Sequence, residues 1–265
     1  MRLPVFWHPD PGGNVGDHRG SLRLDGPEGH HAAVVRRIAV GEWVRLTDGR
    51  GRYAEGVVTA ADRRGVDVRV ERHGVEPAPT LTLTVVQAVP KGERAEIAVQ
   101  ALVEVGVDRV VPWAAERSQV RLSGERGEKL VAKWRAWAGE ASKQARRTWF
   151  AAVAEVASTA EVAALLADAD AALVLDAAAA QTLGGTALPH TGELVLVVGP
   201  EGGIGSSELA VLAAPTVRLG DTVLRTSTAG AVAAGVALAA TRWRQSPVPP
   251  PVRSPGPPSA PTVVS

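Results

Sequence analysis

The sequence predicts an α/β protein in which a mostly parallel sheet follows a small β-rich module. Three observations lead to this prediction. Short β-like runs fill residues 1–75, apolar strands alternate with helical patterns over residues 76–245, and a glycine-rich loop directly follows a buried strand. With 265 residues, of which 45% are apolar, the chain can bury a substantial core.

The N-terminal module is predicted from strand-like runs at 43–47, 54–59 and 66–70. Turn signals separate these runs, namely Asp48-Gly49, Gly51 and Arg64-Gly65. Short strands joined by tight turns predict a compact β-barrel over residues 1–75. The next segment, Glu76-Pro77-Ala78-Pro79, is typical of a linker.

The region beyond the linker alternates between strand and helix patterns. Helices are predicted at 93–105, with Gly106 as the stop, around Leu130 and Trp134, at 206–213 and at 227–242. Strands are predicted at 81–89, 109–112, 171–175 and 193–198, and the last two are apolar on both faces. This order predicts a mostly parallel sheet covered by helices.

The last segment, residues 246–265, contains eight of the 19 prolines and one charged residue, Arg253. We predict a disordered tail, because such a composition cannot form a core. The absence of cysteine excludes disulfides and thiolate metal sites, and we predict no metal. No apolar run is long enough for a signal peptide or a membrane span, so we expect a cytoplasmic protein with no membrane partner.

A basic stretch runs from residue 117 to residue 147, with nine basic and three acidic residues. This local excess could hold a polyanion, although the net charge of the chain is only +1. The alternative is a solvated helix face, and composition favours neither. Helical spacing places Lys129, Lys133, Lys143 and Arg147 on a face away from the apolar one, where they would stay exposed.

The glycine-rich loop at 199–205 follows the strand 194–198 and precedes a helix that Ser206 or Ser207 could cap. Ligands of open α/β sheets bind beyond the carboxyl ends of the strands, so we predict a site for an adenosine or a phosphate. The loop lacks the lysine of a P-loop and the dinucleotide fingerprint. A tight turn without a ligand is the alternative.

A second loop, at 217–230, repeats this order of strand, turn and helix start, with Ser227 or Thr228 as a possible cap. Two helix starts after consecutive strands could line one pocket with backbone N–H groups. Spacing alone leaves Arg225 equally well explained as a surface arginine.

Together these two loops resemble the SPOUT methyltransferases, through Gly199–Gly203, Leu219-Gly220 and Leu224–Ala229. The sequence is most similar to the RsmE family, which methylates N3 of a uridine in 16S ribosomal RNA. The resemblance covers about residues 1–245 and includes five further segments in the same order: His30–Arg37 with Val40-Gly41-Glu42, Lys91-Gly92, Glu104–Val107, Glu116–Ser118 and Glu140–Arg147. The chain departs from the family at Ser227, where many members have Glu, and at Ala32-Ala33, where a bulky apolar residue is common.

The resemblance implies a PUA-like RNA-binding β-barrel domain over residues 1–75 and a SPOUT methyltransferase domain with a deep trefoil knot over residues 76–245. It also implies S-adenosylmethionine as cofactor, 16S rRNA of the small ribosomal subunit as partner, and a homodimer with the active site at the subunit interface.

The site residues follow from this resemblance and from the two loops. Arg225 is the predicted catalytic residue, orienting either the cofactor or the uracil. Glu201 is a candidate base, although a carboxylate held by loop N–H groups or the ribose is an equal alternative. The predicted cofactor-binding residues are Leu175, Gly199, Pro200, Glu201, Gly202, Gly203, Leu219, Gly220, Leu224, Thr226, Ser227, Thr228 and Ala229. The predicted RNA-binding residues are Arg2, His30, Arg36, Arg37, Arg117, Lys133, Lys143, Arg146 and Arg147.

Two other functions remain open from the sequence. One is a non-catalytic RNA-binding protein that keeps the β module and the basic helix. The other is a SPOUT enzyme acting on another position, such as a ribose 2′-O.

Overall fold

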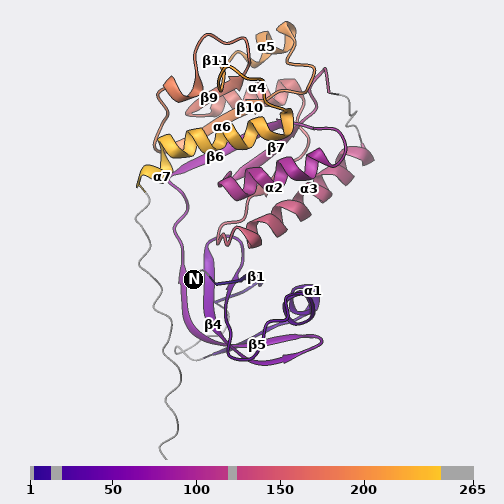
Figure 1. The fold of residues 1–265 in the computed structure, drawn as a ribbon, viewed down its shortest axis with the longest axis vertical. Coiled ribbons are helices and arrows are strands. Elements are labelled where there is room, and N and C mark those ends of the chain that lie inside the picture. Colours follow the sequence, from indigo (N-terminus) through magenta and orange to yellow (C-terminus); the bar gives the residue numbers. More distant parts are fainter. Residues whose placement is uncertain (1–2, 13–19, 119–123, 246–265) are drawn as a thin grey trace, which may run out of the picture.

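The computed structural model describes residues 3–12, 20–118 and 124–245, and contains two sheets. Arg2 and the predicted tail lie outside the described residues. Figure 1 shows the helix-covered sheet above the N-terminal sheet, with the chain from β5 to β6 running between them.

The N-terminal sheet has the strand order β1-β3-β4-β5-β2, in which only the β1–β3 pair is parallel. Register shifts at Glu55/Gly56 and Val58/Ala60 interrupt the β4–β5 pairing, and such bulges bend and twist a strand. The small core contains Phe6, Leu46 and Val68. The elements are β1 (Val5–Trp7), β2 (Ser21–Leu24), α1 (Gly26–His30), the π-helical turn η1 (His31–Val35), β3 (Trp43–Thr47), β4 (Arg52–Asp62) and β5 (Gly65–Val75).

The second sheet is parallel throughout, in the order β11-β9-β10-β6-β7-β8. This confirms the predicted parallel α/β arrangement. Its strands are β6 (Leu81–Ala88), β7 (Arg109–Trp113), β8 (Ala152–Val153), β9 (Ala171–Leu175), β10 (Gly192–Val198) and β11 (Thr216–Val217). Its helices are α2 (Arg94–Val105), α3 (Glu125–Gln144), α4 (Thr159–Asp168), the short 3-10 turn η2 (Leu183–Gly185), α5 (Ser206–Leu212), α6 (Thr226–Ala240) and α7 (Arg242–Gln245).

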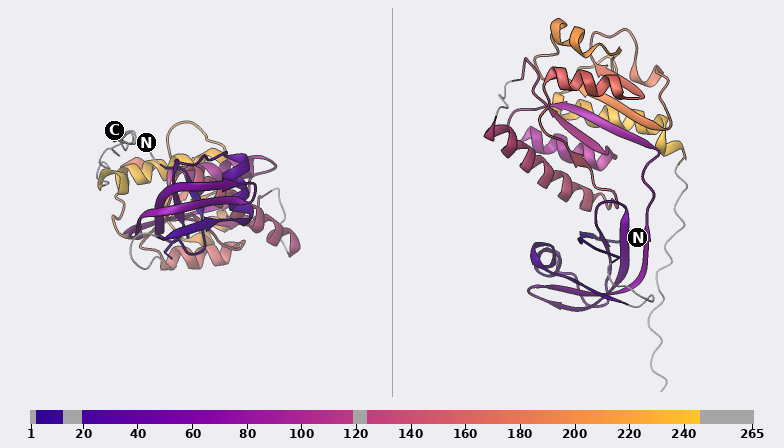
Figure 2. Two further views of the ribbon diagram at one scale, coloured as in Figure 1. Left: turned by 90° about the horizontal axis from the view of Figure 1, so that it is seen from below. Right: turned by 180° about the vertical axis from the view of Figure 1, so that it is seen from behind.

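Helices cover both faces of this sheet, as Figures 1 and 2 show. Alternate residues of β10 point to opposite faces: Leu194 and Leu196 pack with α2, α3 and α6, whereas Val195 and Val197 pack with α4 and α5. This double burial explains why residues 194–198 of the strand are all apolar. The chain moves outward from β6 to β8 and then returns to β9 beyond β10, so the strand order reverses beside β10. Ligand crevices form at such reversals.

The predicted helix caps are wrong. Gly205 and Arg225 are the N-cap residues of α5 and α6, with extended backbones and no side-chain cap hydrogen bond. Ser206 and Ser227 lie inside the first turns instead, because α5 begins one residue, and α6 two residues, earlier than a cap at these serines requires. Thr241 ends α6 and separates it from α7, where one continuous helix was predicted.

Candidate active site

The glycine-rich loop leaves the carboxyl end of β10 and turns tightly into α5. A β-carbon on Gly199 would lie 2.6 Å from Ile204 Cγ1, so the two residues can approach only because Gly199 has no side chain. Gly203 donates to the Pro200 carbonyl and has a positive φ of 72°, a conformation that favours glycine. The glycines therefore fold the loop back on itself.

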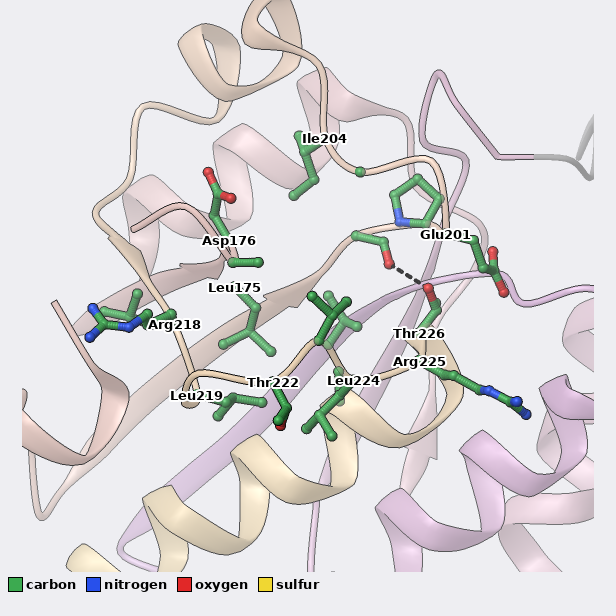
Figure 3. Close-up of a pocket in the computed structure, with 18 of the residues that line it drawn as sticks. Leu175, Asp176, Glu201, Ile204, Arg218, Leu219, Thr222, Leu224, Arg225 and Thr226 are labelled. Atoms are coloured by element: carbon green, nitrogen blue, oxygen red, sulfur yellow. Dashed lines mark hydrogen bonds between the residues drawn. The ribbon is translucent and has the colours of Figure 1, made fainter. Parts of the chain in front are cut away.

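The second loop ends where α6 begins, and α6 begins against the first loop. Thr226 Oγ1 donates to the Gly199 carbonyl over 3.1 Å, the bond drawn in Figure 3. The buried amide of Gln87, near the end of β6, donates to the Thr226 carbonyl at 3.2 Å. The first and second loops, which lie far apart in sequence, are thus joined at the carboxyl ends of the central strands.

A cavity of about 400 Å³ lies between these two loops. Most of the predicted cofactor-binding residues line it: Leu175, Gly199, Pro200, Glu201, Gly203, Leu219, Gly220, Leu224, Thr226 and Ala229. Figure 3 shows Leu175, Leu219 and Leu224 gathered around one space. Its size falls in the range of small-molecule sites.

Three predicted residues do not line this cavity. Gly202 instead contacts Arg117, whose Nη1 donates to the Gly202 carbonyl at 3.2 Å. Ser227 is buried within α6, and Thr228 Oγ1 donates to the Arg225 carbonyl.

Sequence reasoning missed several residues of the cavity, among them Asp176, Ile204 and Arg218. Asp176 directly follows β9, and its position at the carboxyl end of a buried strand is the signal that could have found it. Arg218 donates to the carbonyls of Ala179 and Ala180, so it holds the loop after β9 against β11.

Arg225 and Glu201 lie at the exposed rim of the cavity. In Figure 3 the Arg225 side chain extends away from the three leucines, on the side where Glu201 also lies. Charged side chains at the mouth of an apolar cavity can contact a second reactant while a ligand fills the interior.

The predicted RNA-binding residues divide into two groups. His30, Arg36, Arg37, Arg117, Lys133 and Arg146 are exposed. The predicted exposure of Lys143 and Arg147 is wrong, because tertiary contacts hold both. The Lys143 ammonium binds Glu28 and Glu140, and its side chain is 7% exposed.

Arg147 is mostly buried beside the end of α2 rather than on an exposed helix face. It donates to the carbonyls of Val103 and Val107 and forms an ion pair with Asp108 at 3.0 Å. Burial lowers the pKa of Arg147, while the charge of Asp108 opposes this shift. For Lys143, burial lowers the pKa, but Glu140 and Glu28 outweigh it and leave the pKa above its ordinary value.

Comparison with known proteins agrees with this fold and site. Residues 76–238 match the profile of the RNA methyltransferase domain, and residues 24–71 match the RNA methyltransferase PUA domain. Ribosomal RNA small subunit methyltransferase E of Mycobacterium bovis is 45% identical over 231 residues, which cover 84% of this chain and 88% of that protein. The protein of the same name from Bacillus subtilis is 27% identical over 220 residues, covering 79% and 86%.

A solved structure from Legionella pneumophila, assigned to the methyltransferases and in complex with the cofactor SAM, has a TM-score of 0.78. It is 26% identical, and the match covers 91% of this chain and 99% of that one. Fold and site together define an RNA methyltransferase of the SPOUT class, with a PUA-like N-terminal part. Within that class, the chain belongs to the ribosomal RNA small subunit methyltransferase E (RsmE) family.

The residues of the cavity fit S-adenosylmethionine (SAM). Leu175, Leu219 and Leu224 offer apolar walls to an adenine ring, and the carboxylates of Asp176 and Glu201 suit a ligand with hydroxyl groups and positive charge. Gly199, where a β-carbon would force Ile204 or the loop to shift, keeps the backbone of the loop at the cavity wall.

Proposed function

We propose that this chain methylates N3 of a specific uridine in 16S ribosomal RNA, with SAM as the methyl donor. The observation that carries the proposal is the cavity between the two loops, which the hydrogen bond from Thr226 to Gly199 joins. The name and 45% identity of the mycobacterial relative support the rRNA substrate. The N3 position rests on the resemblance to the RsmE family.

In this proposal the apolar walls and the loop backbone of 199–203 and 219–229 hold the cofactor. When bound, SAM supplies an electrophilic methyl group on a sulfonium. The chain's own contribution is to place the uracil in line with that group and to exclude water from the contact.

Arg225 is the proposed catalytic residue. N3 of uracil loses a proton during the reaction, and the resulting negative charge spreads to O2 and O4. A guanidinium at the rim of the cavity can stabilise that charge through hydrogen bonds. Glu201, on the same side of the cavity, is placed either to accept the proton or to bind the ribose of the cofactor.

We further propose that the enzyme acts in the cytoplasm, where ribosomal subunits are assembled, and that it is a knotted homodimer. Apolar side chains on the outer surface of the C-terminal helices support the dimer, since Val232 of α6 is 44% exposed and Trp243 of α7 is 51% exposed. Among the described residues, no helix is both long and apolar enough to cross a membrane.

The test measures methyl transfer from labelled SAM to small subunits that lack the modification, and identifies the product nucleoside by mass spectrometry. Replacing Arg225 by Ala is expected to lower turnover by about 100-fold, the usual effect of removing one charge-stabilising donor. The affinity for SAM, measured by calorimetry, should change only a few-fold. Arg225→Lys, which keeps the charge, should retain more turnover than Arg225→Ala.

Unchanged turnover of Arg225→Ala would remove the catalytic role. A methyl group on ribose instead of the base would move the enzyme to the 2′-O class. Failure of the wild-type chain to bind SAM would leave only a non-catalytic RNA-binding protein.

A further inference from the structure

A second, smaller cavity of about 60 Å³ lies where the N-terminal sheet meets the end of α3. Figure 1 shows this end of α3 directed toward the N-terminal sheet. The two parts of the chain each contribute polar side chains to the cavity: His31 and Arg36 from the first, and Glu140, Lys143, Gln144 and Arg146 from the second.

Contacts within the protein fix the position of lining residues on both sides of the cavity. The Lys143 ammonium is tied to Glu28 of α1 and, at 2.7 Å, to Glu140 of its own helix. These pairs use two of its three hydrogen-bond donors and leave the third. On the other side, the His31 ring packs edge-on against Phe6, with centroids 6.3 Å apart, and the Arg36 N–H donates to the His31 carbonyl.

The backbone beside this cavity adopts an uncommon conformation at two arginines. Arg37, next to Arg36, and Arg146 have positive φ angles of 53° and 59°. Outside glycine such angles are uncommon. At Arg146 the angle belongs to the turn that ends α3, where the Arg146 N–H donates to the Lys143 carbonyl and the Arg147 N–H donates to the Ser142 carbonyl. The positive φ of Arg146 ends α3 at the cavity and directs the chain back toward Asp108 through Arg147.

The charges of the cavity favour an anion. Arg36, Lys143 and Arg146 stand against two carboxylates, Glu140 and Glu28, and Lys143 pairs with both, so the local balance is positive. A volume of about 60 Å³ is too small for a base or an amino acid side chain with its backbone, but it admits a compact group such as a phosphate. Arginine is suited to phosphate because its planar guanidinium donates two parallel hydrogen bonds.

We propose that this cavity binds one backbone phosphate of the substrate RNA, with Arg36 and Arg146 as its principal donors and His31 and Gln144 beside them. This inference rests on the proposed function, which supplies the RNA. In this proposal the junction between the N-terminal part and the end of α3 is a recognition site. Side chains from both sides of the junction hold the same phosphate. The RNA would then enter the active site only in the register that this phosphate fixes.

The test compares Arg36→Gln, Arg146→Gln and the double variant with wild type, using the full chain and a 16S rRNA fragment that contains the target uridine. Each single variant should weaken RNA binding by about 5- to 10-fold and reduce the slope of log affinity against log salt by about 0.7–0.9, the loss of one phosphate contact. The double variant should lose little more slope than either single one, because both arginines hold the same phosphate.

Lys129→Gln is the control, since Lys129 is an exposed residue of α3 that pairs with Glu125 and does not line the cavity. It removes the same charge outside the cavity and should change affinity less than 2-fold. Affinity for SAM should be unchanged in every variant, which shows that the fold is intact. Ethylation of individual RNA phosphates should reveal one position that blocks wild type and is silent for the double variant.

The inference would be overturned if Arg36→Gln and Arg146→Gln weaken RNA binding no more than Lys129→Gln does. Methyl transfer by wild type in the same experiment would still uphold the proposed function. Absence of RNA binding and methyl transfer in wild type would instead overturn the proposed function.

Discussion

At the scale of single residues, Gly199 links the fold to the cavity. Its position must be free of a side chain, because Ile204 of the returning loop occupies the space that a β-carbon would take. Its carbonyl accepts the hydrogen bond of Thr226, which starts α6. One glycine thus determines both the turn of the first loop and the attachment of the second.

Replacing Gly199 by Ala should weaken SAM binding by at least 10-fold, because a contact of 2.6 Å to Ile204 Cγ1 forces the loop or the isoleucine to shift. Calorimetric titration with SAM measures this effect. Gly184→Ala is the control, since its β-carbon would meet no atom within 4 Å, and it should bind SAM as wild type does. Equal affinities of the two variants would contradict this account of the loop.

At the scale of elements, α4 shows how local side chains fix where a helix begins. Ser158 accepts the N–H of Glu161, and Glu161 accepts the N–H of Ser158, which is a capping box. The backbone N–H of Ser158 and then its hydroxyl lower the pKa of Glu161. α5 and α6 have no such cap, and both begin at the cavity instead.

Ser158→Ala should lower the free energy of unfolding by about 1 kcal/mol, the usual cost of losing a serine cap. Urea denaturation at neutral pH measures the difference. Ser206→Ala, in the first turn of a helix that Gly205 caps, should change stability by less than about 0.5 kcal/mol.

Stability should also depend on the ionisation of Glu161. A carboxyl group whose pKa is lowered by folding stabilises the protein above its unfolded pKa, and this contribution disappears as pH falls through the folded pKa. Wild type should therefore be more stable than Glu161→Gln at pH 7, and the difference should shrink below about pH 4.5. A difference that is independent of pH would contradict the assignment.

The longer strands of the second sheet were predictable because burial on both faces makes nearly all of their residues apolar, as in 171–175 and 193–198. The two-residue strand β8 was not predicted, because so short a segment carries no pattern. The two loops were predictable because each follows a strand pattern and precedes a helix pattern, although glycine alone did not separate a ligand site from a tight turn. Caps were mispredicted because residue type alone favoured Ser206 or Ser207 over Gly205, and Ser227 or Thr228 over Arg225. The burial of Lys143 could not be predicted, because its partner Glu28 lies 115 residues away and no local sequence pattern indicates such a pair.

At the scale of the whole molecule, the two sheets are joined by an interlock between the β3–β4 turn and residues 148–150. Gly51 donates to the Thr148 carbonyl, Phe150 donates to the Gly49 carbonyl, and Trp149 Nε1 donates to the Glu76 carbonyl. Buried Thr47 also donates to the Thr148 carbonyl. These bonds fix the orientation of the N-terminal sheet against the methyltransferase part.

Gly51→Ala should disturb this interlock, because its φ is +95° and a β-carbon would lie 2.7 Å from the Trp149 ring and from the Glu76 carbonyl. We expect a larger radius of gyration in small-angle X-ray scattering and weaker RNA binding, with SAM affinity kept. Gly139→Ala, which meets no atom within 4 Å inside α3, is the control and should leave the scattering curve unchanged.

The interlock also limits which chimeras between family members can fold. The turn at 48–51 contacts the backbone and aromatic rings of residues 148–150, which lie nearly a hundred residues later in the chain. The N-terminal part therefore cannot be exchanged alone. A chimera that imports this part from another member must import the matching Thr148-Trp149-Phe150 tripeptide as well. Family members that differ at this tripeptide should carry compensating changes in the β3–β4 turn, so the two segments should evolve as one unit.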